Sequence, residues 1–151
     1  MRLATEHPPF IISIFALIFE GDYHVLLGRR RDYDIWNLPG GGLRHDETVT
    51  EGIVREVREE TGLVVEVDRL VGVYSKPYKN EVALTFQCRQ VDGELQPTEE
   101  AAEWRYFSVD DLPQELLPKH RERILDAARH QAPAILRVQH GPADLEVLGL
   151  V

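Results

Sequence analysis

The apolar positions near the start of the chain predict a β-hairpin. Phe10–Phe19 is an almost unbroken apolar run, and Tyr23–Arg29 is a second apolar segment. Only the short Glu20-Gly21-Asp22 sequence separates them. Two apolar runs joined by a short turn containing Gly and Asp are typical of neighbouring antiparallel strands. We therefore expect the chain to begin with two paired strands.

The spacing of apolar residues changes after Glu47 and predicts a helix. There the apolar positions recur every three or four residues, at Val49, Ile53, Val54 and Val57. This is the apolar stripe of a helix that packs one face on a core. The stripe stops at Thr61-Gly62, and glycine is suited to end a helix in the left-handed conformation.

Strand patterns return after this helix. The expected strands are Leu63–Val67, Leu70–Tyr74, Val82–Val91 and Glu103–Phe107. A second helix is predicted over Gln114–His130, and Ala134–Val138 with Leu145–Val151 is interpreted as a small added hairpin. Strands on both sides of a central helix, with another helix near the end, indicate an α/β fold in which helices cover a mixed sheet.

The size and charge of the chain narrow the class of protein. The 151 residues fit one domain, residues 1–151, that can bury a core without disulfides. The single cysteine, Cys88, is expected to be a buried structural thiol. The net charge of −9 argues against a broad basic surface for DNA or RNA. An acidic protein can still bind an anionic substrate if divalent cations neutralise the site.

The first apolar run also has to be compared with a secretory or membrane segment. Pro9–Phe19 is too short to span a bilayer. Only one basic residue, Arg2, precedes it, and Glu20-Gly21-Asp22 follows it in place of a small-residue cleavage site. We interpret it as a buried strand, and we expect a cytoplasmic protein that does not enter a membrane.

The predicted first helix gathers acidic residues on one face. Glu56, Glu59 and Glu60 are three and four residues apart, so they project together, away from the apolar stripe. Clustered carboxylates suit hard cations such as Mg²⁺ or Mn²⁺. Arg55 can pair with Glu59 or with Glu47 and hold a carboxylate in one orientation.

The helix alone does not separate a metal site from an ordinary solvated face. Glu51 and Arg58 are expected to be plain surface residues of that kind. The residues upstream favour a site, because Gly40-Gly41-Gly42 allows the backbone to approach a ligand closely and Pro39 fixes the approach to that loop. A glycine triplet by itself is more often a turn.

Together these residues resemble the Nudix box. The family pattern has Gly, five residues, Glu, seven residues, then Arg-Glu-aliphatic-any-Glu-Glu-any-Gly-aliphatic. Here it runs from Gly41 through Glu47 to Arg55–Leu63, and every defined position matches. Chance agreement at the seven fixed positions falls below about one in 10⁸ per window. The flanking segments are also similar to the family, so the resemblance covers about residues 9–113.

The resemblance implies a Nudix-type α/β/α sandwich that hydrolyses a diphosphate linkage with Mg²⁺ or Mn²⁺. The substrate would be a nucleoside diphosphate linked to another group, attacked by water at phosphorus. Matched by position, the principal metal ligands would be Glu56 and Glu60, and Glu59 would share metal binding or act as the base. The Gly40 carbonyl would add a ligand, Glu47 would be a supporting acid, and Arg55 would orient the carboxylates.

Other site residues are expected outside the box. Family members often use a further glutamate before a late strand, and Glu100 is preferred here over Glu99 and Glu103. Arg29 and Arg30 follow a strand that leads to the site, and either could meet a phosphate. Arg44 stands where many members have an acid, and it could also contact a phosphate.

Aromatic residues are the candidates for stacking on a base. Tyr78, beside Pro77, is the candidate among them for substrate binding. Tyr74 and Trp36 could also stack on a base, although packing in the core or at its rim is the default for these two and for Tyr78.

Alternative functions remain at this stage. A Nudix-like domain can sense nucleotides without cutting them, but the complete box and the lack of room for a helix-turn-helix extension favour the enzyme. An RNA-end hydrolase is disfavoured by the net charge of −9. A homodimer is possible, and the residues that select the substrate lie outside the box.

Overall fold

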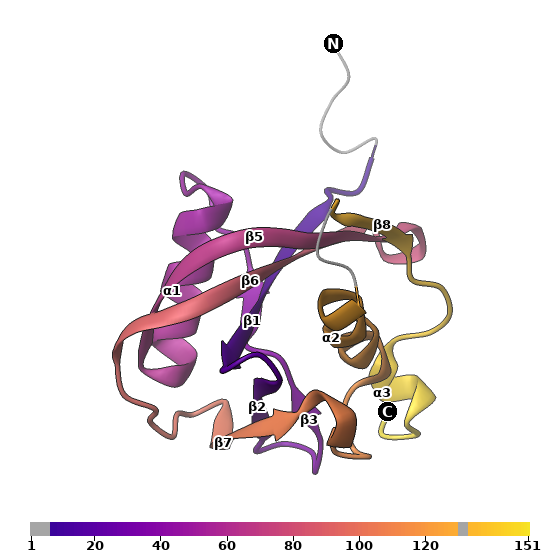
Figure 1. Cartoon of the computed structure of the whole chain (residues 1–151). Helices are drawn as coiled ribbons and strands as arrows, with labels where there is room; N and C mark the ends of the chain where they lie inside the picture. The colour runs from indigo at the N-terminus through magenta and orange to yellow at the C-terminus, as the bar shows by residue number, and fades with distance from the viewer. Residues whose placement is uncertain (1–6, 130–132) are drawn as a thin grey trace.

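The computed structural model of the chain describes residues 7–129 and 133–151, and its strands form a mixed sheet (Figure 1). The strands are β1 (Ile11–Glu20), β2 (His24–Arg30), β3 (Trp36–Asn37), β4 (Gly40–Gly42), β5 (Leu63–Lys76), β6 (Glu81–Gly93), β7 (Ala101–Ser108) and β8 (Ile135–Val138). The helices are α1 (Val49–Thr61), α2 (Pro118–Arg129) and α3 (Asp144–Val147), with 3₁₀ turns η2 (Pro77–Lys79) and η3 (Val109–Asp111). Within the described residues, no helix is both long and apolar enough to cross a membrane.

β1 lies in the middle of the sheet, whose order is β3-β2-β1-β6-β5-β8. It forms the predicted antiparallel hairpin with β2 and runs parallel to β6. β4 also pairs with β1, and β7 pairs with β2. β5 is antiparallel to β6 and parallel to β8. The sheet is therefore mixed, as the sequence predicted.

Alternate residues of β1 point into two separate cores. One buried cluster joins one face of β1 to α1 and includes Ile14, Ala16, Ile18, Ile53 and Val57. The other joins the opposite face of β1 to α2 and includes Leu17, Ile124 and Ala127. Because successive side chains of a strand point to opposite faces, one unbroken apolar strand supplies both cores. The result is a sheet with α1 and α2 on opposite sides (Figure 1).

The ends of α1 follow the predicted signals. Thr48 caps its start, accepting a hydrogen bond from the Glu51 backbone N–H at 3.1 Å, while the Glu51 carboxylate accepts one from the Thr48 N–H at 3.2 Å. This reciprocal capping box satisfies two amides that the helix leaves without partners. Gly62 ends the helix with φ of 84°, and a Cβ there would lie 2.4 Å from the Glu94 carbonyl oxygen. Only glycine fits that position.

The C-terminal half differs from the prediction in three places. Leu63–Val67 and Leu70–Tyr74 belong to one strand, β5, because irregular register near Arg69 bends it without ending it. The second helix begins at Pro118, not Gln114, because the Leu116 backbone bridges to Trp36 of β3, although its side chain is buried in the second core. Proline favours the first position of a helix. The predicted end at His130 lies outside the described residues.

The predicted tail hairpin is wrong. β8 pairs in parallel with β5, and the segment predicted as its partner contains the helical turn α3. The loop at Gly141, with φ of 84°, therefore leads into a helix and not into a returning strand. The predicted strand Ala134–Val138 does contain β8, but β8 pairs with β5 and not with the segment that follows it.

Cys88 is buried on β6, as expected for a structural thiol. Burial raises the pKa of its thiol to about 12. The thiolate that reacts with electrophiles or metals is therefore not formed near neutral pH.

Candidate active site

The loop before α1 is held against β1 by close backbone contacts. Gly40 and Gly41 lie on β4, opposite Phe15 and Ile14 of β1. A Cβ on Gly40 would lie 2.2 Å from the Ile14 carbonyl oxygen, and one on Gly41 would lie 2.6 Å from the Glu56 Oε1. A side chain on Gly40 would clash with the β1 backbone, and one on Gly41 would have to displace the Glu56 carboxylate, so the glycines let the loop approach β1 and a carboxylate of α1.

Arg55, in the middle of α1, holds three carboxylates. Its guanidinium donates to both oxygens of Glu47, from Nε to Oε2 at 2.9 Å and from Nη2 to Oε1 at 2.7 Å. Its Nη1 lies 2.9 Å from Glu56 Oε1 and 3.3 Å from Glu59 Oε2. Nη2 also donates to the Gly42 carbonyl at 3.2 Å. Arg55 therefore fixes the loop and the helix in one arrangement.

The charge of Glu47 is stabilised by these contacts. The hydrogen bonds from Arg55, together with one from the Arg44 backbone N–H at 2.8 Å, lower the pKa of Glu47 to about 2. The same carboxylates raise the pKa of Arg55 above its ordinary value. A carboxylate that accepts several donors is held ionised and oriented.

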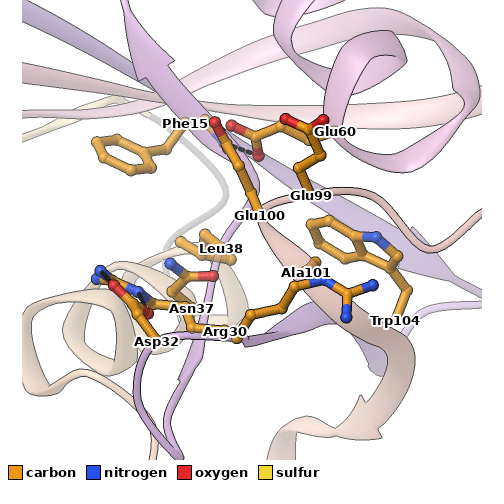
Figure 2. A pocket seen from close by; sticks show the side chains of 12 residues that line it. Phe15, Arg30, Asp32, Asn37, Leu38, Glu60, Glu99, Glu100, Ala101 and Trp104 are labelled. Carbon is orange, nitrogen blue, oxygen red and sulfur yellow. Dashed lines mark hydrogen bonds and ion pairs between the residues drawn. The ribbon is translucent and has the colours of Figure 1, made fainter.

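Glu60 is the buried acid of the group. It accepts a hydrogen bond from the Gly40 N–H at 3.1 Å. Burial, with the nearby charges of Glu56 and Glu100, raises the pKa of Glu60 well above its ordinary value. Figure 2 shows the Glu60 side chain beside Glu99 and Glu100, which come from the segment just before β7. α1 and the segment before β7 therefore bring like charges together.

A cavity of about 410 Å³ opens beside these carboxylates. Its lining includes Glu60, Glu99 and Glu100 on one side, and Arg30 with Trp104 elsewhere (Figure 2). Acids at one end and a cation with an aromatic ring at the other suit a ligand that carries both phosphates and a ring system.

Neighbouring hydrogen bonds anchor both sides of the cavity. Arg30 Nε donates to Asp32 Oδ1 at 2.8 Å. Arg31 Nε donates to the Thr98 carbonyl at 2.7 Å. The turn from Thr98 to Ala101 is closed by the Thr98 N–H, which donates to the Ala101 carbonyl at 3.1 Å, and by the Ala101 N–H, which donates to Thr98 Oγ1 at 3.3 Å. Arg31 therefore fixes the turn that carries Glu100.

A divalent cation has to be tested against the donors present. Across residues 7–129 and 133–151, no three His, Cys, Asp or Glu side chains already converge as a complete metal site. The donors near Glu60 are nevertheless all oxygens, as Mg²⁺ and Mn²⁺ prefer. Burial first, and then the charges of Glu56 and Glu100, raise the pKa of Glu60. A hard cation fits this donor set, because it would remove the repulsion.

Comparison with known families identifies the constellation. The family profile described as the NUDIX domain matches residues 9–128, which include the whole loop, α1 and the cavity. The chain belongs to the Nudix hydrolase family.

The similar proteins differ in what their names say of substrate. A MutT-like protein of Streptomyces ambofaciens is 36% identical over 87% of this chain and 86% of its own length. The crystal structure of an ADP-ribose pyrophosphatase from Streptococcus suis superposes with a TM-score of 0.70 and 32% identity, over 85% of this chain and 98% of that one. A NAD-capped RNA hydrolase NudC of Pseudomonas aeruginosa is 33% identical over 92% of this chain but only 49% of its own length.

Several residues singled out from the sequence meet at this Nudix centre. Glu60, Glu100, Gly40 and Arg30 line the cavity. Glu47 and Glu56 lie behind them, in contact with Arg55 and only 13% exposed in each case. Glu51 and Arg58 are exposed on the surface of α1, as expected.

Others lie at the edge of the centre or away from it. Glu59 is 49% exposed, and Arg44 Nη2 lies 3.6 Å from its Oε1. Arg29 Nη2 lies 2.6 Å from Asp34 Oδ1, in a shallower cavity that Glu103 also lines. Tyr78 lies on η2 and lines a different cavity, so the structure does not bring it beside Glu60.

The two other aromatic candidates are core residues. Trp36 is buried and packs edge-on against Phe107, with ring centroids 4.8 Å apart. Tyr74 is fully buried and donates from its hydroxyl to Asp126 at 2.9 Å. The default of core packing is confirmed for both.

Sequence reasoning missed Trp104 as a lining residue. Its indole Nε1 is buried and has no hydrogen-bond partner among the described residues. Its ring lies opposite Gly28 of β2, where a Cβ would be 2.6 Å away. A glycine inside the apolar strand Tyr23–Arg29 was the available signal, because glycine in a strand often marks the close approach of another group.

Proposed function

We propose that this Nudix domain is a Mg²⁺- or Mn²⁺-dependent hydrolase that cuts the diphosphate linkage of a nucleoside diphosphate joined to another group. The observation that carries the proposal is the position of Glu60. It is buried beside Glu56 and Glu100, and it opens onto a cavity that also contains Arg30 and Trp104. If these acids had only a structural role, replacing one of them with an uncharged residue would make the folded protein more stable.

Each acid has a separate role in this proposal. Glu56 and Glu60 hold the cation, with the Gly40 backbone alongside. When bound, the cation neutralises the substrate phosphates and makes a water more acidic. Glu59 is exposed at the edge of the group and either shares metal binding or takes the proton of the attacking water.

Arg55 and Glu47 position the acids without touching the reacting atoms. The bidentate pair keeps Arg55 fixed, and Arg55 in turn fixes one oxygen of Glu56 at 2.9 Å. Glu100 faces the same centre from the opposite side, held by the turn that Arg31 anchors. It is the further catalytic acid from outside the box.

The far side of the cavity binds the rest of the substrate. Arg30 supplies positive charge for a phosphate, and the unpartnered indole N–H of Trp104 supplies a donor. Arg29, beside Asp34, and Arg44, beside Glu59, are exposed cations that act as secondary phosphate contacts. The name of the Streptococcus suis relative supports ADP-ribose as the first substrate to try.

The oligomer is a separate part of the proposal. β8 is an edge strand, and Leu136 and Val138 on it are 81% and 47% exposed. Exposed apolar residues on an unpaired edge favour pairing with another strand. We infer a homodimer, while the net charge of −9 disfavours DNA as a partner.

A nucleotide panel tests the proposal. The purified chain is incubated in ¹⁸O-water with Mg²⁺ or Mn²⁺ and ADP-ribose, nucleotide sugars, nucleoside triphosphates and dinucleoside polyphosphates. We expect cleavage of at least one, with ¹⁸O in a phosphorylated product. Glu59→Gln and Glu60→Gln should each reduce the rate. Tight nucleotide binding with no cleavage across the panel would instead make the domain a sensor.

A further inference from the structure

A second cavity lies at the end of β5 farthest from α1, between η2 and the first turn of α2. Its volume is about 120 Å³, which holds a small ion and not a whole nucleotide. Four cationic side chains line it, from Lys76, Lys79, Lys119 and Arg123, against one carboxylate, that of Asp144. An excess of positive charge in an otherwise acidic protein is a feature that the hydrolytic site does not require.

Arg123 is the unusual member of this cavity. Its side chain is completely buried, and Nη2 donates to Gln139 Oε1 at 2.9 Å. Its Nε and Nη1 have no hydrogen-bond acceptor among the described residues. The rings of Phe15 and Tyr74 lie 4.7 Å and 5.2 Å from the guanidinium carbon, but a ring face does not replace an acceptor for an N–H.

Among the described residues, the carboxylates near Arg123 each have another partner, although the charges of Asp144, Glu81 and Glu122 still favour its charged form. Asp126 on the same helix is bound by Tyr74 and by Arg137, at 2.9 Å and 3.0 Å. Asp144 is 2.8 Å from Lys119 Nζ, and Glu81 is 2.8 Å from Lys76 Nζ. The local carboxylates are therefore taken. A buried guanidinium with two nitrogens that lack acceptors is destabilising unless an anion meets it.

His120 adds a neutral donor to the same wall. Its Nδ1 accepts a hydrogen bond from the Leu38 N–H at 2.9 Å. Burial and the surrounding cations hold the pKa of His120 well below its ordinary value, so the ring is neutral. A neutral imidazole that accepts at Nδ1 carries its proton on Nε2. The wall thus combines cations with a fixed N–H donor, which is the chemistry of an oxyanion site.

We propose that this cavity binds a phosphate group through Arg123, supported by Lys76, Lys79 and Lys119. An oxyanion would supply an acceptor to Nε or to Nη1, and the planar guanidinium can pair either of these nitrogens with Nη2 to meet two oxygens of one phosphate. The group can come from inorganic phosphate or from a nucleotide, and the chemistry of recognition is the same. Phe15 lines the first cavity and packs on His120, with ring centroids 5.0 Å apart, so the two sites are separate.

The test measures binding without any divalent cation. The full chain, with a chelator present and ionic strength held constant, is titrated with inorganic phosphate and then with a nucleoside 5′-monophosphate. Amide ¹H–¹⁵N shifts and the Arg123 Nε–H resonance are followed by NMR. We expect saturable shifts at Tyr78, Lys79 and Arg123, and none at Glu60 or Glu100. A shift with phosphate identifies the free ion as sufficient, and a shift with the nucleotide alone assigns the phosphate to a larger ligand.

Three variants make the assignment specific. Arg123→Met keeps an unbranched stem against Phe15 and Tyr74 and should weaken the phosphate Kd by about tenfold or more. Lys79→Met is exposed, does not threaten folding, and should weaken it by about two- to fivefold. Arg129→Met, an exposed charge at the end of the same helix, should change nothing.

Three results would overturn the proposal. The first is the absence of saturable shifts around this cavity with either ligand. The second is a loss of affinity in Arg129→Met equal to that in Lys79→Met, which would mean that only overall charge matters. The third is unchanged affinity in Lys79→Met together with unchanged affinity in Arg123→Met. If Arg123→Met does not fold, Lys79→Met against Arg129→Met decides alone.

Discussion

Arg55 and Glu47 form a two-pronged ion pair across eight residues of chain, with N–O distances of 2.7 Å and 2.9 Å. Their side chains are only 17% and 13% exposed. The pair joins the glycine loop to α1, and the same guanidinium reaches Glu56 and Glu59. One guanidinium can reach all of these carboxylates only if Glu47 stands at this distance from the helix glutamates. The spacing in the sequence therefore determines the geometry of the site.

Replacing Arg55 with lysine tests this positioning role. Lysine keeps the charge but has no planar fork, so it cannot hold Glu47 and Glu56 at once. We expect kcat to fall by about 10- to 100-fold while circular dichroism shows a folded protein. The matched change Arg58→Lys, on the exposed face of the same helix, should leave kcat unaltered. Equal losses in both variants would show that Arg55 acts only on the helix.

Gly41 and Gly42 provide a matched pair for the glycine loop. A Cβ on Gly41 would lie 2.6 Å from Glu56 Oε1, whereas one on Gly42 would have nothing within 4 Å. Gly41→Ala should displace the Glu56 carboxylate and weaken Mg²⁺ activation by about 10- to 100-fold. Gly42→Ala should be close to wild type. Indistinguishable Mg²⁺ titrations for the two variants would contradict the close approach of Glu56.

The ionisation of Glu47 gives a pH dependence with a definite sign. Its pKa in the folded protein is lowered from the model-peptide value of 4.5 to about 2. A lowered folded-state pKa adds stability that is fully present above the unfolded-state value and is lost as the pH falls toward the folded-state value. Urea unfolding at several pH values should show Glu47→Gln less stable than wild type at pH 6. The difference should shrink between about pH 4.5 and pH 2. A difference that is constant with pH would show that charge at Glu47 is not involved.

Trp104 is predicted to contact the substrate. Trp104→Phe keeps a ring against Gly28 but removes the indole N–H, which has no partner among the described residues. One lost hydrogen bond corresponds to about a fivefold rise in KM, with little change in kcat. Steady-state kinetics on the best substrate of the panel measure both constants. A change in thermal stability with KM unaltered would assign Trp104 to packing alone.

The sequence predicted the parts of this protein that depend on local pattern. The hairpin at Glu20–Asp22, the helix ending at Gly62 and the sheet with helices on both faces all follow from apolar period and turn chemistry. The tail was mispredicted because β8 pairs with β5, and such distant pairing leaves no trace in a short apolar segment. The start of α2 was also mispredicted because of a distant pairing, since Leu116 forms a bridge with Trp36 of β3.

The candidate site was predictable to a similar extent. The contacts of Arg55 with Glu47 and Glu59 follow from residue spacing along a helix and its preceding loop. Trp104 and the turn at Glu100 enter the cavity only because β7 pairs with β2, which sequence spacing does not encode. The burial of Arg123 without acceptors for Nε and Nη1 was also not predictable, because the sequence of α2 has the pattern of an ordinary helix that packs on a core.

The most direct test of the account is the Mg²⁺ dependence of turnover in wild type and in Glu60→Gln, measured side by side on one cleaved substrate. Glutamine matches the shape of Glu60 and can still accept from the Gly40 N–H, but it removes the buried charge. We expect turnover to require Mg²⁺ in wild type and to fall by about 100-fold or more in the variant. The variant should remain folded. Full, Mg²⁺-dependent turnover in Glu60→Gln would contradict the central claim.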